Sequence, residues 1–355
     1  MARYQTEIAD VSVDFEGTLD RAAALLRRGE LVAFPTETVY GLGADARNGD
    51  AVSAVYAAKG RPSDNPMIVH VASGEEAAAI AEWTPEADAL MKAFWPGALT
   101  LVLPSRGVVA AEATGGLDTV GVRMPDHPIA LALIARSSCA VAAPSANRSG
   151  QPSPTTAQHV YDDLNGRIPL ILDGGATSVG VESTVLSLAG ERPTILRPGS
   201  ITPEQIERVI GGVELSPGAL APLESGEKAL SPGMKYRHYA PTAEVMLIDG
   251  RDDEVVQAIC AYYDQLAGDK KVIIFTSREN ARFYADRKYA IMGGKGDMEE
   301  YCRQLYAQLR RADDEGIEII LIEAVPSVSA GLAFMNRALR AAEFRLIAAR
   351  TLLAK

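Results

Sequence analysis

Along the first 211 residues, short apolar runs alternate with segments whose apolar residues recur every three or four positions. The runs predict buried strands, and the periodic segments predict amphipathic helices. The expected strands are 31–36, 67–73, 98–105, 119–125, 139–147, 170–175, 183–188 and 193–199. The expected helices are 19–28, 50–60, 73–83, 85–95, 127–137, 155–166 and 202–211. Several strands follow one another without a helix between them, so the sequence predicts an α/β fold with a mixed sheet.

Polar residues and prolines mark some boundaries of these elements. Asp50 and Thr202 are expected to cap the helices that begin beside them. Residues 38–45, TVYGLGAD, follow Pro35 and contain two glycines. They are predicted to form a turn-rich loop after the first strand.

The pattern changes at 212–242, where proline and glycine are frequent and apolar periodicity is lost. This segment is predicted to be a linker, and the aromatic and basic residues of its end, MKYRHYAP, favour a functional role over a passive tether. After it, the expected strands are 243–249, 270–277, 289–294 and 317–325, and the expected helices are 252–268, 297–316 and 329–346. The predicted organisation is a domain at 1–211, a linker at 212–242 and a smaller, Rossmann-like α/β domain with a parallel sheet at 243–355.

Composition and charge narrow the class of protein. The chain is 47% hydrophobic and 23% charged, as globular proteins are, and its net charge of −11 argues against a protein that coats nucleic acid. Its three cysteines are far apart, with no CxxC and no Cys/His cluster at zinc spacing. We therefore expect a reduced, cytoplasmic protein without a bound structural metal. The N-terminus has no apolar signal segment and no apolar run reaches the roughly 18 residues of a membrane span, which predicts no membrane association.

Lys59 and Arg61 stand two residues apart in the segment KGRPSDNP, directly after a predicted helix. In an extended backbone alternate side chains point to the same face, so both cations could contact one anion. Lysine brings a point charge and arginine a planar fork, a pair suited to a polyphosphate. Spacing alone leaves a solvated surface turn as the alternative, since paired cations are common.

Three further segments place hydroxyl groups, amides or glycines next to predicted strands. PTETVYGLG (35–43) could bind a small polar ligand or form an ordinary β-turn. PSANRSGQPSP (144–154) lacks the GxSxG of a nucleophile elbow. DGGATSVGVEST (173–184) lacks the order of a P-loop, although its backbone amides could hold an anion. A plain surface loop is the alternative for the last two segments.

Several motifs occur in a fixed order along the chain. They are PTETVYGLG, KGRPSDNPMIVHV, GVRMPDHP, PSANRSGQPSPT, ESTV and LRPG. Together they resemble the YrdC/Sua5 family, the L-threonylcarbamoyladenylate synthases, and the segments SPGMKYRHYAP and GLAFMNRALRAA are similar to its long, two-domain Sua5 form. The likeness covers nearly the entire chain. Met67, for a more usual leucine, and Leu186, where valine is frequent, depart from the family pattern.

The resemblance implies a YrdC-like twisted, open, mixed sheet with a concave, positively charged pocket, and it implies a nucleotidyltransferase. Members of the family make threonylcarbamoyl-AMP and pyrophosphate from L-threonine, bicarbonate and ATP, with Mg²⁺ arriving with the nucleotide. The product feeds the N6-threonylcarbamoyl modification of adenosine 37 in tRNAs that read ANN codons, through downstream threonylcarbamoyl transferase proteins. No stable complex with nucleic acid is expected.

The resemblance also assigns site residues in three groups. For L-threonine they are Thr36, His70, Arg123 and Ser183, with Arg123 as partner of the carboxylate. For ATP they are Lys59, Arg61, Asn65, Thr119, Ala143, Ser145, Asn147, Ser153 and Arg197, with Lys59 and Arg61 also expected to be catalytic. In the linker, Arg237, His238 or Tyr239 would close over the pocket as a lid.

These residue types suit the implied reaction. A carbamate oxygen must attack the α-phosphorus of ATP, so the protein has to neutralise and align anions and needs no covalent nucleophile. One rival interpretation is an RNA-binding module of YrdC-like fold, which the acidic net charge weakens. Another is a carbamoyl-adenylate enzyme of the hydrogenase-maturation type, which the missing zinc-finger cysteine pattern weakens.

Overall fold

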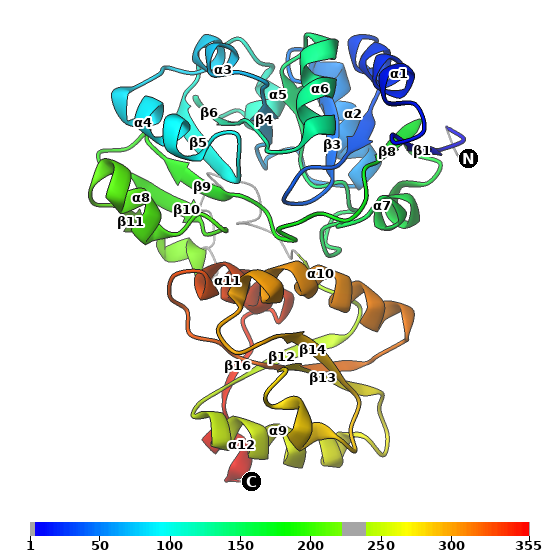
Figure 1. Ribbon diagram of the computed structural model, residues 1–355, viewed down its shortest axis with the longest axis vertical. Coiled ribbons are helices and arrows are strands. Elements are labelled where there is room, and N and C mark those ends of the chain that lie inside the picture. The colour runs from blue at the N-terminus through cyan, green and yellow to red at the C-terminus, as the bar shows by residue number, and fades with distance from the viewer. Residues whose placement is uncertain (1–3, 222–238, 355) are drawn as a thin grey trace. The chain divides into compact units, whose positions relative to one another are not determined.

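The computed structural model describes residues 4–221 and 239–354. The chain forms two compact units, Met1–Ser149 with Ser153–Tyr236, and Gly150–Pro152 with Arg237–Lys355. Each unit is built on one β-sheet flanked by helices (Figure 1). The predicted α/β class is confirmed for both units.

The first unit contains every strand and helix that the sequence predicted for it. Its strands are β1 (Glu7–Asp10), β2 (Val32–Phe34), β3 (Gly41–Asp45), β4 (Ile68–His70), β5 (Leu99–Pro104), β6 (Thr119–Arg123), β7 (Val141–Ala142), β8 (Leu170–Asp173), β9 (Thr184–Ser187), β10 (Thr194–Arg197) and β11 (Glu214–Leu215). Its helices are α1 (Phe15–Arg27), α2 (Gly49–Lys59), α3 (Gly74–Ile80), α4 (Pro85–Phe94), α5 (Ala111–Thr114), α6 (Pro128–Ser137), α7 (Ala157–Leu164) and α8 (Pro203–Ile210), followed by the 3₁₀ turn η1 (Pro217–Ala219). Four short elements, β1, β3, β11 and α5, were not predicted.

The described strands of this unit pair in the order β1-β8-β2-β3-β7-β4-β6-β5-β9-β10-β11. Parallel pairs such as β4 with β6 occur beside antiparallel pairs such as β5 with β6, so the predicted mixed sheet is confirmed. The prediction of a turn-rich loop at 38–45 is wrong for Gly41–Asp45, because these residues form β3, which pairs antiparallel with β2. A Cβ added at Gly43 would lie 2.8 Å from the Phe34 ring, so here the glycine permits close packing within a strand.

Side-chain caps determine where helices α2 and α8 begin. Asn48, and not the predicted Asp50, caps α2 by accepting a hydrogen bond from the Ala51 N–H at 3.1 Å. Thr202 caps α8 as predicted, and Gln205 accepts a bond from the Thr202 N–H to complete a capping box.

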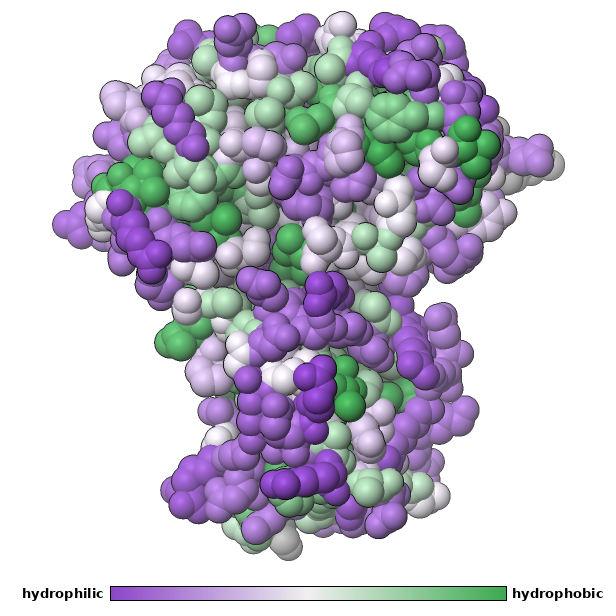
Figure 2. Space-filling model, viewed as in Figure 1, coloured by the Kyte–Doolittle hydropathy of each residue, from purple (hydrophilic) through white to green (hydrophobic). Residues whose placement is uncertain are grey.

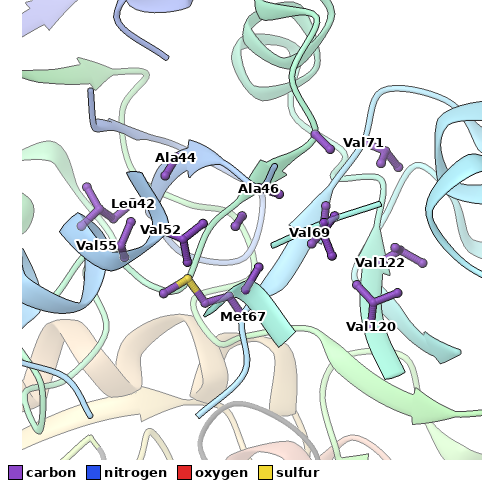
Figure 3. Packing of buried hydrophobic residues seen from close by; sticks show 14 of the residues in the cluster. Leu42, Ala44, Ala46, Val52, Val55, Met67, Val69, Val71, Val120 and Val122 are labelled. Atoms are coloured by element: carbon purple, nitrogen blue, oxygen red, sulfur yellow. The ribbon is translucent and has the colours of Figure 1, made fainter. Parts of the chain in front are cut away.

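One face of the first sheet carries the main core. Val69 of β4 and Val120 and Val122 of β6 point into it, together with Leu42 of β3 and Val52 of α2 (Figure 3). Residues of α2, α3, α4, α5, α7 and α8 cover this face. Full burial of such aliphatic side chains contributes roughly 1.5–3 kcal/mol each.

The helices that the structure describes cover the opposite face only in part. Leu19 of α1 and Leu133 of α6 pack there with Phe34 of β2 and with residues of β7 and β8. Farther along the sheet, the same face carries a small apolar cluster made of strand residues alone: Ile68, Val102, Val185 and Leu196. Because side chains alternate along a strand, the polar residues of β4, β5 and β6 share this face. We call it the open face.

The second unit has the strands β12 (Glu244–Asp249), β13 (Val272–Ser277), β14 (Tyr289–Gly293), β15 (Ile319–Glu323) and β16 (Leu346–Ala348). Their order is β14-β13-β15-β12-β16 and their pairs are parallel, which confirms the predicted parallel sheet. Helices α9 (Asp252–Leu266) and α12 (Ala349–Leu353) lie on one side of it and α10 (Met298–Asp314) and α11 (Gly331–Ala341) on the other (Figure 1). The 3₁₀ turn η2 (Ala281–Tyr284) connects β13 to β14.

The last predicted helix, 329–346, is wrong in its final turn. Helix α11 ends at Ala341, and Glu343 and Phe344 then take positive φ values of 51° and 61°. This left-handed stretch turns the chain into the unpredicted strand β16.

The surface is mostly hydrophilic in the view of Figure 2, where apolar residues form scattered patches. The apolar side chains that dominate the composition are gathered in the cores of the two units. Among the residues described, no helix has both the length and the hydropathy to cross a bilayer.

Candidate active site

Lys59 is the last residue of α2, and it is buried. Its residue surface is only 4% exposed. Its Nζ donates to the backbone carbonyls of Ser145 and Asn147, the latter at 2.5 Å, and lies 3.4 Å from Asn147 Oδ1. Gly60, at a φ of 62°, ends the helix in the left-handed conformation. The alternative of a solvated surface cation is therefore wrong for Lys59, which ties α2 to the loop after β7.

Arg61 and Asn65 lie in the loop that leads from α2 to β4. The half-buried Arg61 guanidinium donates to the carbonyls of Asn65 and Pro66 at 3.0 and 2.9 Å. Asn65 is fully buried, and neither polar atom of its amide has a hydrogen-bond partner among the described residues. A buried amide left in this state destabilises a fold by about 1–3 kcal/mol. Asn65 thus points to a ligand that would supply the missing bonds.

The loop after β7 carries three of the predicted nucleotide residues. The Ala143 N–H donates to the Ile68 carbonyl at 3.0 Å, which anchors the loop beside β4. Ser145 Oγ donates to Asn147 Oδ1 at 2.6 Å, and Asn147 Nδ2 donates to the Arg148 carbonyl at 2.8 Å. The structure therefore brings Ser145 and Asn147 into one polar network with Lys59.

The loop after β2 folds around Arg123 of β6. Thr36 Oγ1 donates to the Val39 carbonyl at 2.7 Å and lies 2.8 Å from Thr38 Oγ1. Thr38 Oγ1 accepts from Arg123 Nη1 at 3.0 Å. Glu37 Oε1 lies 2.6 Å from Arg123 Nη2, and the two side chains are only 10% and 4% exposed. This buried ion pair joins the PTET loop to the open face.

His70 ends β4 and lies opposite Arg123 in the parallel register with β6. Its ring meets Phe34 edge-on, with centroids 6.3 Å apart. Burial, and then the charge of Arg123, lower the pKa of His70 to about 3, so the imidazole is neutral near pH 7. Its Nδ1 has no hydrogen-bond partner in the described part of the chain. A neutral ring with one unmet position is suited to a polar ligand beside Arg123.

Ser183 and Arg197 extend the site toward β9 and β10. Ser183 is fully buried, and its Oγ lies 2.8 Å from Thr100 Oγ1 of β5. Arg197 donates from Nε to the Ser183 carbonyl at 3.1 Å and from Nη2 to Ser183 Oγ at 3.2 Å. These three residues link neighbouring strands on the open face.

Thr119 and Ser153 are the last two predicted nucleotide residues, and both belong to the first unit. Thr119 begins β6 and lines a small cavity with Pro66 and Thr100. Ser153 is fully buried, and its Oγ donates to Glu182 Oε1 at 2.5 Å.

The predicted residues fall at the two ends of the parallel strands β4 and β6. Asn65 and Thr119 lie at the amino ends of these strands, with Lys59 and Arg61 nearby, whereas His70 and Arg123 end them. A strand rises about 3.3 Å per residue, so Thr119 and Arg123, which are four residues apart, are separated by roughly 13 Å along β6. A cationic group and an Arg–Glu–His group are thus within the span of one small molecule.

Two of the proposed lid residues, Arg237 and His238, lie outside the described residues. Tyr239 belongs to the second unit and is 4% exposed. Its ring centre lies 5.3 Å from that of Tyr306 and 6.0 Å from the guanidinium carbon of Arg337. Its contact with a ligand stays a prediction.

Three polar residues of this region were missed by the sequence analysis: Glu37, Thr100 and Glu182. Glu37 lies inside the PTET motif, but an acidic residue is not expected beside a site for anions. Its position is explained by the buried ion pair with Arg123, which the sequence alone does not reveal. Thr100 could have been found from the alternation of β5, since it is the one polar position among the buried side chains of Leu99–Leu103.

Two family models match successive parts of the chain. The first, Sua5_yciO_yrdC, is described as telomere recombination and matches residues 24–199. The second is described as the C-terminal domain of threonylcarbamoyl-AMP synthase and matches residues 201–343.

Similar proteins extend over nearly the whole chain. Threonylcarbamoyl-AMP synthase of Bacillus subtilis is 48% identical over 347 residues, 97% of this chain and 99% of that protein. The synthase of Pyrococcus abyssi is 48% identical over 331 residues, 92% of this chain and 94% of that protein. A crystal structure of P. abyssi Sua5 with L-threonine matches with a TM-score of 0.89 and 45% identity, covering 97% and 99% of the two chains. The chain therefore belongs to the two-domain Sua5 family of threonylcarbamoyl-AMP synthases.

Proposed function

We propose that this chain is a nucleotidyltransferase that makes L-threonylcarbamoyladenylate and pyrophosphate from L-threonine, bicarbonate and ATP. The observation that carries the proposal is the placement of two residue groups at opposite ends of β4 and β6. The names of the relatives, and the L-threonine in the P. abyssi complex, support the same reaction.

L-threonine would bind at the carboxyl ends of these strands. Arg123 has five N–H donors, and three of them contact Gly97, Thr38 and Glu37. The other two are available to the substrate carboxylate, while the Glu37 carboxylate could hold the ammonium group. Thr36, Ser183 and the unmet Nδ1 of His70 would surround the hydroxyl group. Buried partners of this kind disfavour an analogue without the hydroxyl, because they would be left unpaired.

ATP would lie toward the amino ends, with its phosphates at Lys59 and Arg61. Lys59 could exchange its long contact with Asn147 Oδ1 for a phosphate oxygen and keep the two carbonyl contacts that fix the ammonium group. Asn65 would regain hydrogen bonds to a phosphate. Thr119, Ser145, Ser153 and Arg197, with the backbone of Ala143, would line the nucleotide and carbamoyl region.

The chemical step then joins two anions. Bicarbonate takes up a proton and loses water to give CO₂. The amine of threonine gives up a proton, for which Glu37 is a nearby acceptor, and its nitrogen adds to the carbon of CO₂. A carbamate oxygen attacks the α-phosphorus, and the bond from that phosphorus to the β-phosphate oxygen breaks. Fixed cations stabilise the pyrophosphate charge as it develops, without reorganisation during the reaction. Lys59 and Arg61 have this role in the proposal.

Magnesium is proposed to enter with ATP. The described residues contain no group of three or more His, Cys, Asp or Glu side chains placed to hold a metal ion. Such an ion would take phosphate oxygens and water as most of its ligands, as Mg²⁺ commonly does at phosphate sites. It would add positive charge at the β- and γ-phosphates.

The adenylate is a mixed anhydride, so its threonylcarbamoyl group is activated for transfer to an amine. We propose that a separate transferase uses this product and moves the threonylcarbamoyl group to N6 of adenosine in tRNA. A role as an RNA-binding module is not favoured. Lys59, Arg123 and Arg197 are 3–4% exposed, whereas contacts to an RNA backbone need exposed cations.

The test is pyrophosphate release with ATP, bicarbonate and L-threonine, omitting each in turn. We expect release only when all three are present, and less with 2-aminobutyrate in place of threonine. Release that does not depend on threonine, together with a gel shift of tRNA or duplex RNA at physiological salt, would instead support the RNA-binding alternative.

A further inference from the structure

The second unit contains a cavity of about 440 Å³ that the proposed reaction does not use. Its walls come from the segments that follow β12, β13, β14 and β15, and from the first turns of α9 and α10. Gly250, Ser277 and Glu323 place it at the carboxyl edge of the parallel sheet. Its volume lies within the 300–1,000 Å³ typical of small-molecule sites.

The strand order explains why the sheet is open at this point. β13 and β15 are neighbours, but the chain leaves β13 toward β14 at one edge and leaves β15 toward β16 at the other. Their connections therefore diverge and leave a crevice beyond the strand ends. Parallel α/β sheets bind their ligands at such crevices.

Glu323 is the central charge of the cavity, and it is 7% exposed. Its Oε2 accepts from the Ser277 N–H at 3.1 Å, and its Oε1 accepts from Asn280 Nδ2 at 3.1 Å and from the Tyr284 hydroxyl at 2.8 Å. Burial, and then the charge of Glu323, raise the pKa of Tyr284, so the hydroxyl remains a donor. These neutral donors hold the Glu323 carboxyl group in a fixed position.

The donors leave room on Glu323 for a ligand. A carboxylate can accept about four hydrogen bonds, and the three above leave one acceptor position on Oε2. None of the described cations forms an ion pair with Glu323. A ligand that donates a hydrogen bond would fill this position.

A second carboxylate and a cation lie at the mouth of the cavity. Asp252 Oδ2 lies 2.6 Å from Lys295 Nζ, and Asp252 Oδ1 accepts from Asn280 Nδ2 at 3.1 Å. The lining therefore carries two carboxylates and one ammonium group, and is negative on balance.

This charge argues against a phosphate ligand. The first turn of α9 contains Asp252, Asp253 and Glu254. In nucleotide-binding α/β folds the N-terminus of such a helix attracts a phosphate, but three acids there repel it. A ligand for this cavity should offer hydrogen-bond donors and carry no phosphate.

The remaining walls are apolar. Val255 of α9, Met298 of α10 and Val325 after β15 line the cavity, and Tyr301 adds an aromatic ring. Such walls fit a flat, largely apolar group, in the way that ligand sites combine apolar walls with a few placed polar atoms.

We propose that this cavity binds a nucleoside without a phosphate group, with its base against the apolar wall and its sugar hydroxyls donating to Glu323 and Asp252. The site would be separate from the proposed active site and would give the second unit a ligand of its own.

The experiment uses the full chain and adenosine as the probe, with hydrogen–deuterium exchange read by mass spectrometry. Adenosine should slow exchange in 250–255, 295–301 and 323–331. This protection should persist in Lys59→Ala, in which nucleotide binding at the other unit is weakened. Protection confined to the first unit, or none at all, would overturn the proposal.

Two matched variants locate the contacts. Glu323→Gln should weaken adenosine binding at least about tenfold, since hydrogen bonds to charged groups are strong. Asp252→Asn changes an exposed residue and should keep the fold; it should improve the affinity for AMP relative to adenosine about two- to fivefold by removing a surface charge. AMP that protects 250–255, 295–301 and 323–331 in Lys59→Ala at the same concentrations as adenosine would contradict the proposal, whether or not Glu323→Gln is stable.

Discussion

The two sheets of this protein both gather polar residues at strand ends, but with opposite charge. On the first sheet the polar groups around β4 and β6 include the buried Lys59 and Arg123 and the half-buried Arg61. On the second, the cavity beyond β13 and β15 is centred on Glu323 and bordered by Asp252. Two sheets of similar α/β architecture thus carry cations at the strand ends of one and carboxylates at the strand ends of the other, and the residues at those ends set the charge.

The two regions also differ in how well their polar groups are satisfied. Asn65 and His70 have buried polar atoms without partners among the described residues. Glu323, in contrast, is held by three donors. Unmet buried hydrogen bonds reduce stability, so the first region has a cost that a bound ligand would offset, whereas the polar groups around Glu323 are largely satisfied within the protein.

The largest expected effect is at Arg123. Arg123→Ala should lower kcat/KM for L-threonine by about 10³-fold, since it removes fixed donors from the site. It should also destabilise the first unit by about 3–5 kcal/mol, because Glu37 is left as an uncompensated buried charge. Pyrophosphate release and urea unfolding measure the two effects.

The control for that prediction is Arg123→Ala combined with Glu37→Gln. The double variant should recover part of the stability but none of the activity. Full activity in either variant would show that Arg123 does not bind the substrate.

Lys59→Ala and Arg61→Ala should each lower threonine-dependent ATP turnover by roughly 10²–10³-fold while the fold survives. The reason is that both cations would face the phosphates in the transition state. Glu323→Gln is the matched change in the other unit. The turnover of this variant should stay within about twofold of the wild-type value, because the substitution removes no group from the first site. Near-normal turnover in both cation variants would refute their assignment.

Asn65→Leu should separate stability from activity. It removes a buried amide without partners, so the free energy of unfolding should rise by about 1–2 kcal/mol, while kcat/KM should fall about tenfold. Asn48→Leu is the control, since Asn48 caps α2 and its loss should cost about 1 kcal/mol without changing turnover. If Asn65→Leu lost stability and kept activity, the amide would have a structural role only.

The smallest effect concerns pH. His70 has a folded pKa of about 3, below its ordinary value of 6.5. Below pH 6.5 the unfolded chain takes up a proton at this residue and the folded chain does not, so stability falls by about 1.4 kcal/mol per pH unit. Urea unfolding should show a loss of stability between pH 7.5 and pH 5.5 that is smaller by about 1.4 kcal/mol in His70→Gln. An unchanged loss would mean that His70 is not held neutral.

Most of the regular structure could be predicted from the sequence, because long apolar runs and caps such as Thr202 act locally. The errors arose where tertiary packing decided the outcome. Gly41 and Gly43 suggested a turn, yet they lie in β3, which pairs with β2, and at Gly43 the Phe34 ring leaves no room for a side chain. Strand β1 is only four residues long and has one buried position, Ala9, so no apolar pattern revealed it.

The sequence predicted which motifs contribute to the candidate site, but it did not predict how their side chains are arranged in space. Spacing alone could not distinguish a buried Lys59 from a surface cation, because its burial depends on carbonyls 86 and 88 residues away. Glu37 was missed for the same reason, since its partner Arg123 is distant in the sequence. No sequence motif marks the cavity of the second unit, because the cavity results from the order of the strands in the sheet.

The most direct test of the central claim is to incubate the protein with ATP, labelled bicarbonate and L-threonine, and to isolate the nucleotide products. Wild type and Glu323→Gln should form a labelled adenylate in step with pyrophosphate, and Lys59→Ala should form almost none. Label that never enters an adenylate, or that enters it equally in Lys59→Ala, would contradict the assignment of this reaction to the open face of the first sheet.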